Sequence, residues 1–166
     1  MKKAISVFLT LIMICVATFS VKAQTEIKSR DLNETIVSTV IQDLGDGYVL
    51  EVVVAEQVNS VMPLSDTYTK TGSKTYTLKN DNGDQLVWFK LYGQFDITTG
   101  ISSVCTSSWY SHGIVNDNWS LDSASTSKTA NKAKGQAKFV RKVLFITAET
   151  RECSLILTCD TNGNLS

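Results

Sequence analysis

The sequence contains little of the material from which most catalytic and zinc-binding sites are built. Histidine occurs once in 166 residues, at His112, and there is no Gly-x-Ser-x-Gly motif to place a nucleophilic serine. A zinc site needs several convergent His or Cys ligands, which one histidine does not supply. We therefore expect a non-catalytic protein without a metal site or a cofactor, in which His112 is a loop or surface residue.

An excess of charge of one sign is also missing. The chain carries 16 basic and 16 acidic side chains. Proteins that bind nucleic acid normally concentrate positive charge on one face, because they must neutralise phosphates. This balance predicts that nucleic acid is not a partner.

Long apolar runs are scarce, and the single one lies at the start of the chain. Lys2 and Lys3 precede an apolar run from Ala4 to Phe19, and Val21 and Ala23 occupy the −3 and −1 positions of a cleavage site. This order is typical of a secretory signal peptide, and the run is short for a bilayer-spanning helix. The sequence predicts a signal peptide over residues 1–23, and a secreted, extracellular mature domain that does not span a membrane.

Cleavage at this point would leave residues 24–166 as a single domain. The leader holds three of the 16 basic residues and none of the 16 acidic ones, so the mature chain would carry 13 against 16, a net charge of −3. The remaining 143 residues (166 − 23) are enough to bury one hydrophobic core without a metal.

Alternating apolar and polar residues between turn-forming residues predict an all-β protein. Asn80-Asp81-Asn82-Gly83 is typical of a hairpin turn, while Asn59–Thr71, which contains the single proline, is expected to be a loop. A helix over Thr126–Lys134 is the alternative to a strand there, but Gly135 and the alternation favour a strand. We expect an antiparallel β-sandwich of seven or eight strands, immunoglobulin-like or jelly-roll-like. The predicted strands are Glu34–Gln42, Tyr48–Gln57, Gly72–Asn80, Gln85–Ile97, Ile101–His112, Val115–Ser125, Ala130–Lys142 and Glu152–Asp160.

Three cysteines would remain in the mature chain, which suggests one disulfide and one free thiol in an oxidising compartment. Cys153 and Cys159 lie six residues apart in one predicted strand, about 20 Å at 3.3 Å per residue, which is beyond disulfide reach. Cys105 is therefore expected to pair with one of these two.

A set of core and turn residues resembles a family of small secreted proteins of Gram-positive gut bacteria, a domain of unknown function. The resemblance covers most of the mature chain but contains no catalytic motif, and it implies a bacterial extracellular setting and a Cys105–Cys159 disulfide. One departure is that Ile97 and Gly100 follow Phe95, where the family has an aromatic residue and a glycine sooner. The residues that carry the resemblance are Gly47-Tyr48, Lys74-Thr75, Trp88, Gly93-x-Phe95, Cys105-Thr106-Ser107, Trp119, Leu157-Thr158-Cys159 and Asn162-Gly163-Asn164-Leu165-Ser166.

Aromatic residues in polar surroundings are the best candidates for a ligand site. Trp109, Tyr110 and Trp119 lie in Ser/Thr-rich or Asn-flanked segments, where exposed rings would stack on sugar faces. Packing in the core or at its rim is the alternative for the same rings. We therefore expect a binding module for a glycan, a cell-wall polymer or a surface protein. A structural component of a cell-surface assembly and an unrecognised hydrolase are the other two hypotheses.

Charged clusters give weaker indications. Asp43–Gly47 and Asn80–Asp84 place carboxylates at calcium-like spacing, but neither has the distal glutamate of a calcium loop, and turn formation explains both. A basic stripe would suit an anionic polymer or lipid headgroups, or it would be a solvated strand face. The stripe comprises Lys128, Lys132, Lys134, Lys138, Arg141 and Lys142.

Overall fold

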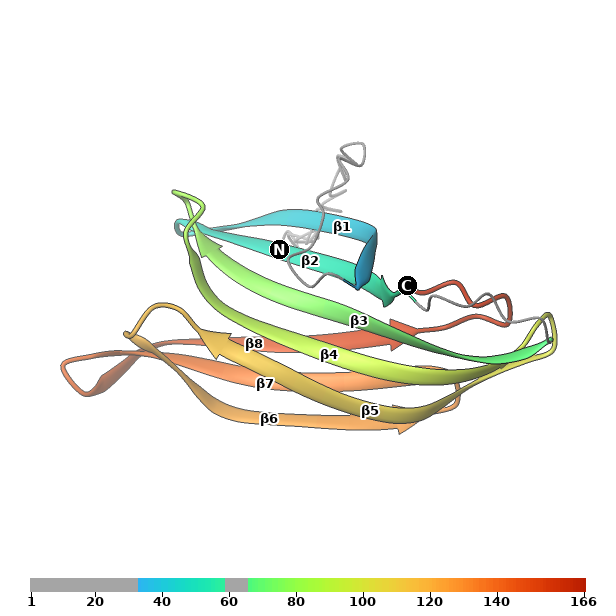
Figure 1. Cartoon of the computed structure of the whole chain (residues 1–166). Helices are drawn as coiled ribbons and strands as arrows, with labels where there is room; N and C mark the ends of the chain where they lie inside the picture. Colours follow the sequence, from blue (N-terminus) through green and yellow to red (C-terminus); the bar gives the residue numbers. More distant parts are fainter. Residues whose placement is uncertain (1–32, 59–65) are drawn as a thin grey trace, which may run out of the picture.

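The computed structural model describes residues 33–58 and 66–166, and the predicted signal peptide lies outside this part of the chain. Within it the chain forms eight strands (Figure 1). No helix is present in the described residues, so none there could cross a membrane. The strands are β1 (Glu34–Gly45), β2 (Tyr48–Gln57), β3 (Thr67–Asn80), β4 (Gln85–Thr98), β5 (Ser102–Ile114), β6 (Trp119–Thr129), β7 (Lys132–Val143) and β8 (Ile146–Thr158).

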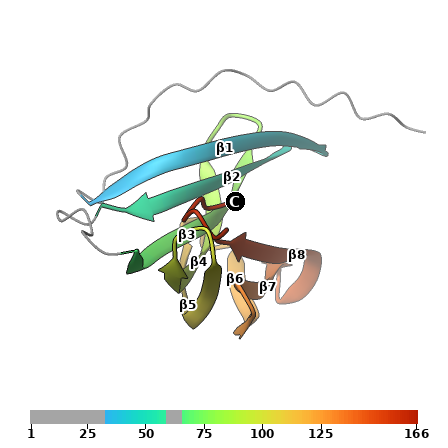
Figure 2. The same ribbon diagram turned by 90° about the vertical axis from the view of Figure 1, so that its right-hand side faces the viewer.

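The strands form two antiparallel sheets, which confirms the predicted all-β sandwich. One sheet has five strands in the order β1-β2-β3-β4-β5, and the other has three in the order β6-β7-β8. Every hydrogen-bonded neighbour is thus adjacent in the chain, whereas immunoglobulin-like and jelly-roll-like sandwiches contain Greek-key connections. The larger sheet curls, so that β1 and β2 lie far from β6 while β5 runs beside it (Figure 2).

One predicted loop differs from the structure, whereas the strand favoured over Thr126–Lys134 is confirmed. The predicted loop Asn59–Thr71 is strand from Thr67 onward, because threonines and Tyr68 continue the alternation of β3. The segment Thr126–Lys134 is not helical: it contains the end of β6, a turn and the start of β7. Ala130 takes a φ of 49° in that turn.

The core lies between the two sheets. Phe89 and Leu91 of β4 are fully buried, and Phe139 of β7 and Leu157 of β8 face them from the other sheet. The sheets approach closely at Gly135, where an added β-carbon would lie 3.0 Å from Leu91 Cδ1. The predicted inward face of β4 is therefore confirmed.

The predicted Cys105–Cys159 disulfide is wrong for this structure. Cys105, Cys153 and Cys159 are all free and buried. The Cys105 thiol lies 3.3 Å from the carbonyl of Ser107, and the Cys159 thiol lies 3.6 Å from that of Asp160. Each of these two thiols therefore has a carbonyl acceptor close by in its own segment, and all three cysteines behave as core residues.

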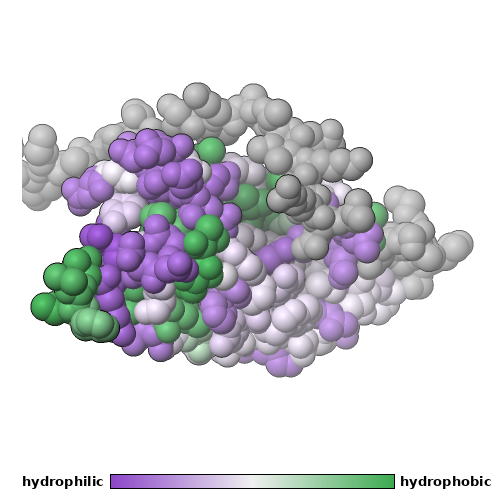
Figure 3. Space-filling view, turned by 60° about the vertical axis from the view of Figure 1, so that its left-hand side comes forward, coloured by the Kyte–Doolittle hydropathy of each residue, from purple (hydrophilic) through white to green (hydrophobic). Residues whose placement is uncertain are grey.

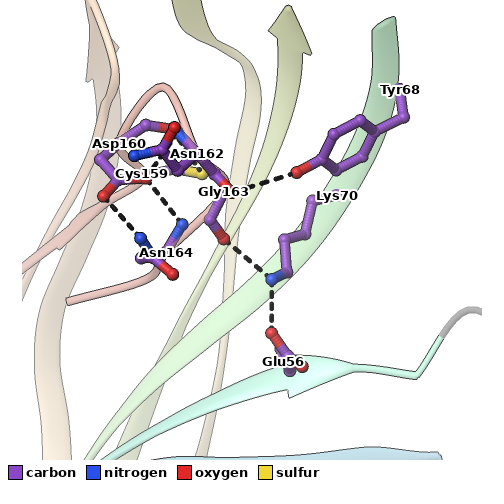
Figure 4. Close-up of polar contacts among 8 residues, drawn as sticks. All are labelled: Glu56, Tyr68, Lys70, Cys159, Asp160, Asn162, Gly163 and Asn164. Atoms are coloured by element: carbon purple, nitrogen blue, oxygen red, sulfur yellow. Dashed lines mark hydrogen bonds and ion pairs between the residues drawn. The ribbon is translucent and has the colours of Figure 1, made fainter. Parts of the chain in front are cut away.

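The C-terminal turn is held against the five-stranded sheet by polar contacts (Figure 4). Asp160 Oδ1 accepts the backbone N–H groups of Asn162 and Asn164, both at 2.8 Å. Lys70 Nζ of β3 donates to the carbonyl of Gly163 at 2.8 Å and pairs with Glu56 of β2 at 2.5 Å. These contacts position the chain end so that Leu165 is buried.

Candidate functional site

Aromatic side chains gather on the outer face of β4 and β5, the face that points away from the three-stranded sheet. Successive residues of a strand point to opposite faces, so the burial of Phe89 and Leu91 places Trp88 and Tyr92 outside. The pairing of β4 with β5 sets Trp109 directly beside Tyr92. Three rings from two strands therefore share one surface.

Tyr92 and Trp109 form a parallel stack. Their ring centroids are 5.3 Å apart and their planes differ by 4°. Trp109 keeps 41% of its surface exposed, and β5 is the last strand of its sheet. One ring is thus held in orientation by its neighbour while it remains accessible to a ligand.

The third ring, Trp88, is fixed by a glycine. Gly113 is its partner on β5, and a β-carbon there would lie 2.1 Å from Trp88 Nε1. The indole therefore lies against the bare backbone of Gly113, which no other residue would allow. Tyr92 lies four positions after Trp88, which spaces the two residues by about 13 Å along β4.

Polar groups lie between and beside the rings. Lys90 Nζ lies 2.6 Å from Glu34 Oε2 and 5.1 Å from the centroid of the Tyr92 ring. Burial alone would lower the pKa of Lys90, but the hydrogen bond and negative charge of Glu34 outweigh it and raise this pKa above 10.5. Ser111 Oγ, at 3.4 Å, is within hydrogen-bonding distance of the Tyr92 hydroxyl. The site therefore combines aromatic faces, hydroxyl groups and a cation neutralised by an adjacent carboxylate.

The structure separates the three aromatic residues that the sequence grouped together. Tyr110 follows Trp109 in β5 and lies on the opposite face, where its ring is 5.4 Å from that of Phe89, although 39% of the residue is exposed as predicted. Trp119 is only 4% exposed and meets Tyr48 edge-on, with centroids 6.3 Å apart. The prediction that Trp119 lies at the surface is wrong, because β6 begins at this residue and turns it into the core.

Trp88 and Tyr92 belong to the site, although the sequence analysis placed them only on one face with Lys90 and did not choose them as ligand residues. Their alternation with Phe89 and Leu91 already placed them on the polar face of the strongest strand. Their proximity to Trp109 depends on the register between β4 and β5, which adjacent sequence positions do not reveal. Sequence alternation showed that Trp88 and Tyr92 lie on the polar face of β4, but only the pairing of β4 with β5 showed that Trp109 lies beside Tyr92.

The surroundings of His112 do not resemble a hydrolase site. Its ring lies 6.2 Å from that of Tyr110, and no hydrogen bond joins it to a serine or a carboxylate within the described residues. Across residues 33–58 and 66–166, no group of three or more His, Cys, Asp or Glu side chains is arranged to hold a metal ion.

A shallow depression of about 330 Å³ lies over the three-stranded sheet. It is lined mainly by polar side chains of β6, β7 and β8, among them Ser125, Gln136, Lys138 and Glu152. No aromatic ring lines it, so it lacks the flat apolar surface that β4 and β5 present.

Comparison with protein-family models, curated proteins and solved structures gives no match to this chain. The functional argument therefore rests on the geometry of the chain itself.

Proposed function

We propose that the protein is a secreted, non-catalytic binding module that holds a glycan or cell-wall polymer across the outer face of β4 and β5. The observation that carries this proposal is the parallel stack of Tyr92 and Trp109, with Trp109 41% exposed at the edge of the sheet. A rigid, accessible indole offers apolar area to the face of a sugar ring at little cost in side-chain entropy.

The polar groups of the site support a ligand rich in hydroxyl groups. Serine hydroxyls both donate and accept hydrogen bonds, and Ser111 lies directly beside the stack. The charge of Lys90 is already compensated by Glu34 at 2.6 Å. Ring stacking and hydroxyl contacts would therefore select the ligand, which favours a neutral polysaccharide over an anionic one.

The length of the aromatic row indicates an extended ligand. Trp88 and the Tyr92–Trp109 stack stand about 13 Å apart on a continuous strand surface. A polymer that lies along β4 would contact both ends of the row, whereas a single sugar ring would contact one. Oligosaccharides are therefore expected to bind more tightly as their length increases.

The test is a titration of the purified protein with neutral wall and host oligosaccharides, followed by tryptophan fluorescence. Trp109→Ala should weaken binding about tenfold or more, because the stacking surface is lost. Val104→Ala, also on the outer face of β5 and 50% exposed, is the matched control and should leave affinity unchanged. Tyr110→Ala should also retain binding, since Tyr110 faces the other way.

Two results would contradict the proposal: no response to any neutral glycan, or equal loss of affinity in Trp109→Ala and Tyr110→Ala. The second result would mean that β5 contributes through stability rather than through its outer face.

One observation favours the alternative role of a structural component. β1 is an edge strand of the larger sheet, and its Val40 and Ile41 are 55% and 67% exposed. An exposed edge rich in β-branched residues can pair with a strand of another chain. Sedimentation of the wild type and of Ile41→Lys tests this role: assembly that disappears in the variant would support it, and a monomer at all concentrations would exclude self-assembly through this edge.

A further inference from the structure

The connection between β7 and β8 is an apolar hairpin tip. Its four residues, Val143, Leu144, Phe145 and Ile146, are 48%, 86%, 100% and 72% exposed. This segment projects at one end of the molecule, and the space-filling view shows a hydrophobic projection there beside hydrophilic side chains (Figures 1 and 3). Sequence reasoning passed over this run, although four consecutive apolar residues without Gly, Asn or Pro are an unusual hairpin turn.

The turn itself is strained. Val143 and Ile146 are the last paired residues, so Leu144 and Phe145 form a two-residue loop. Their φ angles are 49° and 68°, the positive values of a type I′ turn, for which Asn and Gly are strongly preferred. Bulky residues are rare in this region of φ because the β-carbon crowds the backbone. The strain is not offset by burial, because both side chains point into solvent.

A rigid polar cluster supports the base of the tip. Glu149 of β8 accepts a hydrogen bond from the Tyr48 hydroxyl at 2.7 Å, and from Arg141 Nε and Arg151 Nε at 3.0 and 2.7 Å. Tyr48 in turn packs edge-on against the buried Trp119. The base of the apolar tip is therefore connected to the core through Glu149, Tyr48 and Trp119, and we expect these contacts to keep the tip from folding back onto the core.

The segment that contains the tip carries a net positive charge. From Arg141 to Arg151 the chain carries three cations and one acid, a net charge of +2, and Lys142 is exposed next to Val143. Besides Glu149, the carboxylates at the same end belong to the other connections: Asp43, Asp46, Asp81, Asp84 and Asp117. The tip is thus apolar, and the cation nearest to it is free to meet a phosphate group.

We propose that Val143–Ile146 is a membrane-insertion tip, which enters the boundary between headgroups and acyl chains of a lipid bilayer while Lys142 contacts lipid phosphates. Two residues of extended hairpin reach about 7 Å, within the depth of roughly 5–10 Å that interfacial segments occupy. A bilayer accepts an isolated apolar projection without a matching pocket, and adjacent lysine side chains commonly reach to the headgroup level. This proposal is independent of the glycan site, which lies on β4 and β5.

The main test separates membrane insertion from a structural role of the same residues. Leu144→Asn/Phe145→Gly installs the pair that a type I′ turn prefers. The variant should lose binding to vesicles of phosphatidylcholine with phosphatidylglycerol by roughly tenfold or more, while its urea midpoint rises. Ile101→Asn, which alters a 77% exposed residue of another turn, is the control and should bind vesicles as the wild type does. All variants are expressed from the full-length sequence, so any lipid affinity of Ala4–Phe19 is common to them.

A residue-specific readout completes the test. In Phe145→Trp, the new indole should shift its emission to the blue with vesicles and be quenched by brominated lipid, in excess of the wild-type change. An unshifted and unquenched indole would overturn the proposal, as would vesicle binding that survives in Leu144→Asn/Phe145→Gly. It would equally be overturned if this variant were less stable than the wild type, or if sedimentation showed that it abolishes self-association rather than lipid binding.

Discussion

Leu165, the penultimate residue, packs directly on the backbone of Gly72 in β3. A β-carbon at Gly72 would lie 2.4 Å from Leu165 Cδ1, inside any permitted contact. Leu165 is only 6% exposed and lies in the hydrophobic core. The chain end is therefore a packing element of the sandwich, held in place by the polar turn of Figure 4.

Gly72→Ala should destabilise the protein by about 1–3 kcal/mol, because the new methyl group overpacks a filled site. Urea denaturation of the variant and the wild type measures the difference. In the background of Leu165→Ala, which empties the opposing space, the same substitution should cost less. Equal costs in both backgrounds would contradict the contact.

The two faces of the strands should respond differently to alanine. Phe89 is fully buried between the sheets, so Phe89→Ala should cost about 3–5 kcal/mol through lost burial and the cavity it leaves. Lys134 is exposed on β7, and Lys134→Ala should change stability by less than about 0.5 kcal/mol. Similar urea midpoints for the two variants would refute the assignment of faces.

The buried thiols should be inert in the folded protein. Burial raises the pKa of Cys153 from 9.0 to about 12, and burial also raises those of Cys105 and Cys159. A thiol must ionise to react, so alkylation at pH 8 should be slow when the protein is folded and rapid in urea.

Non-reducing peptide mapping should recover all three cysteines unlinked, and a Cys105–Cys159 peptide would contradict the structure.

The raised pKa values of the three buried thiols also predict how the stability of the protein depends on pH. The unfolded thiols ionise near pH 9.0, below their folded pKa values, so stability is complete below that pH and decreases as the pH rises above it.

Glu149 should make the protein sensitive to acid. Burial alone would raise its pKa, but hydrogen bonds from Tyr48, Arg151 and Arg141 outweigh burial and lower it below 4.5. A depressed carboxyl pKa stabilises the folded state above the unfolded value, and this contribution is lost as pH falls through the folded value. Urea midpoints should therefore fall more steeply below about pH 4.5 for the wild type than for Glu149→Gln. Parallel curves would show that this cluster does not contribute.

Local sequence patterns anticipated much of the fold. Alternation in Tyr48–Gln57 reproduced the bounds of β2, and the Asn80–Gly83 turn joins β3 to β4. Turns without typical turn-forming residues were not predicted. Leu144 and Phe145 form a turn that contains no Gly, Asn or Pro, so the hairpin tip was not recognised from the sequence. The start of β3 was likewise hidden, because threonine-rich segments suit loops as well as exposed strands.

The candidate site was likewise predicted only in part from the sequence. Alternation placed Trp88 and Tyr92 on the outer face, but Trp109 and Tyr110 were treated as one surface although adjacent residues of a strand point in opposite directions. Trp119 looked exposed because Asn118 and Ser120 flank it, yet it caps the end of the core beside Tyr48. Polar residues next to a side chain in the sequence therefore do not show whether residues of another strand bury that side chain.

The sequence by itself determined the all-β class, the approximate position of most strands and the inward face of β4, because these depend on the period-two geometry of a strand and on turn-forming residues. Only the tertiary structure decided which residues meet: Tyr92 with Trp109, Trp88 with Gly113, and Leu165 with Gly72. It also left the three cysteines as separate buried thiols. Such contacts depend on strand register and on how two sheets pack, which arise from interactions between segments distant in the chain.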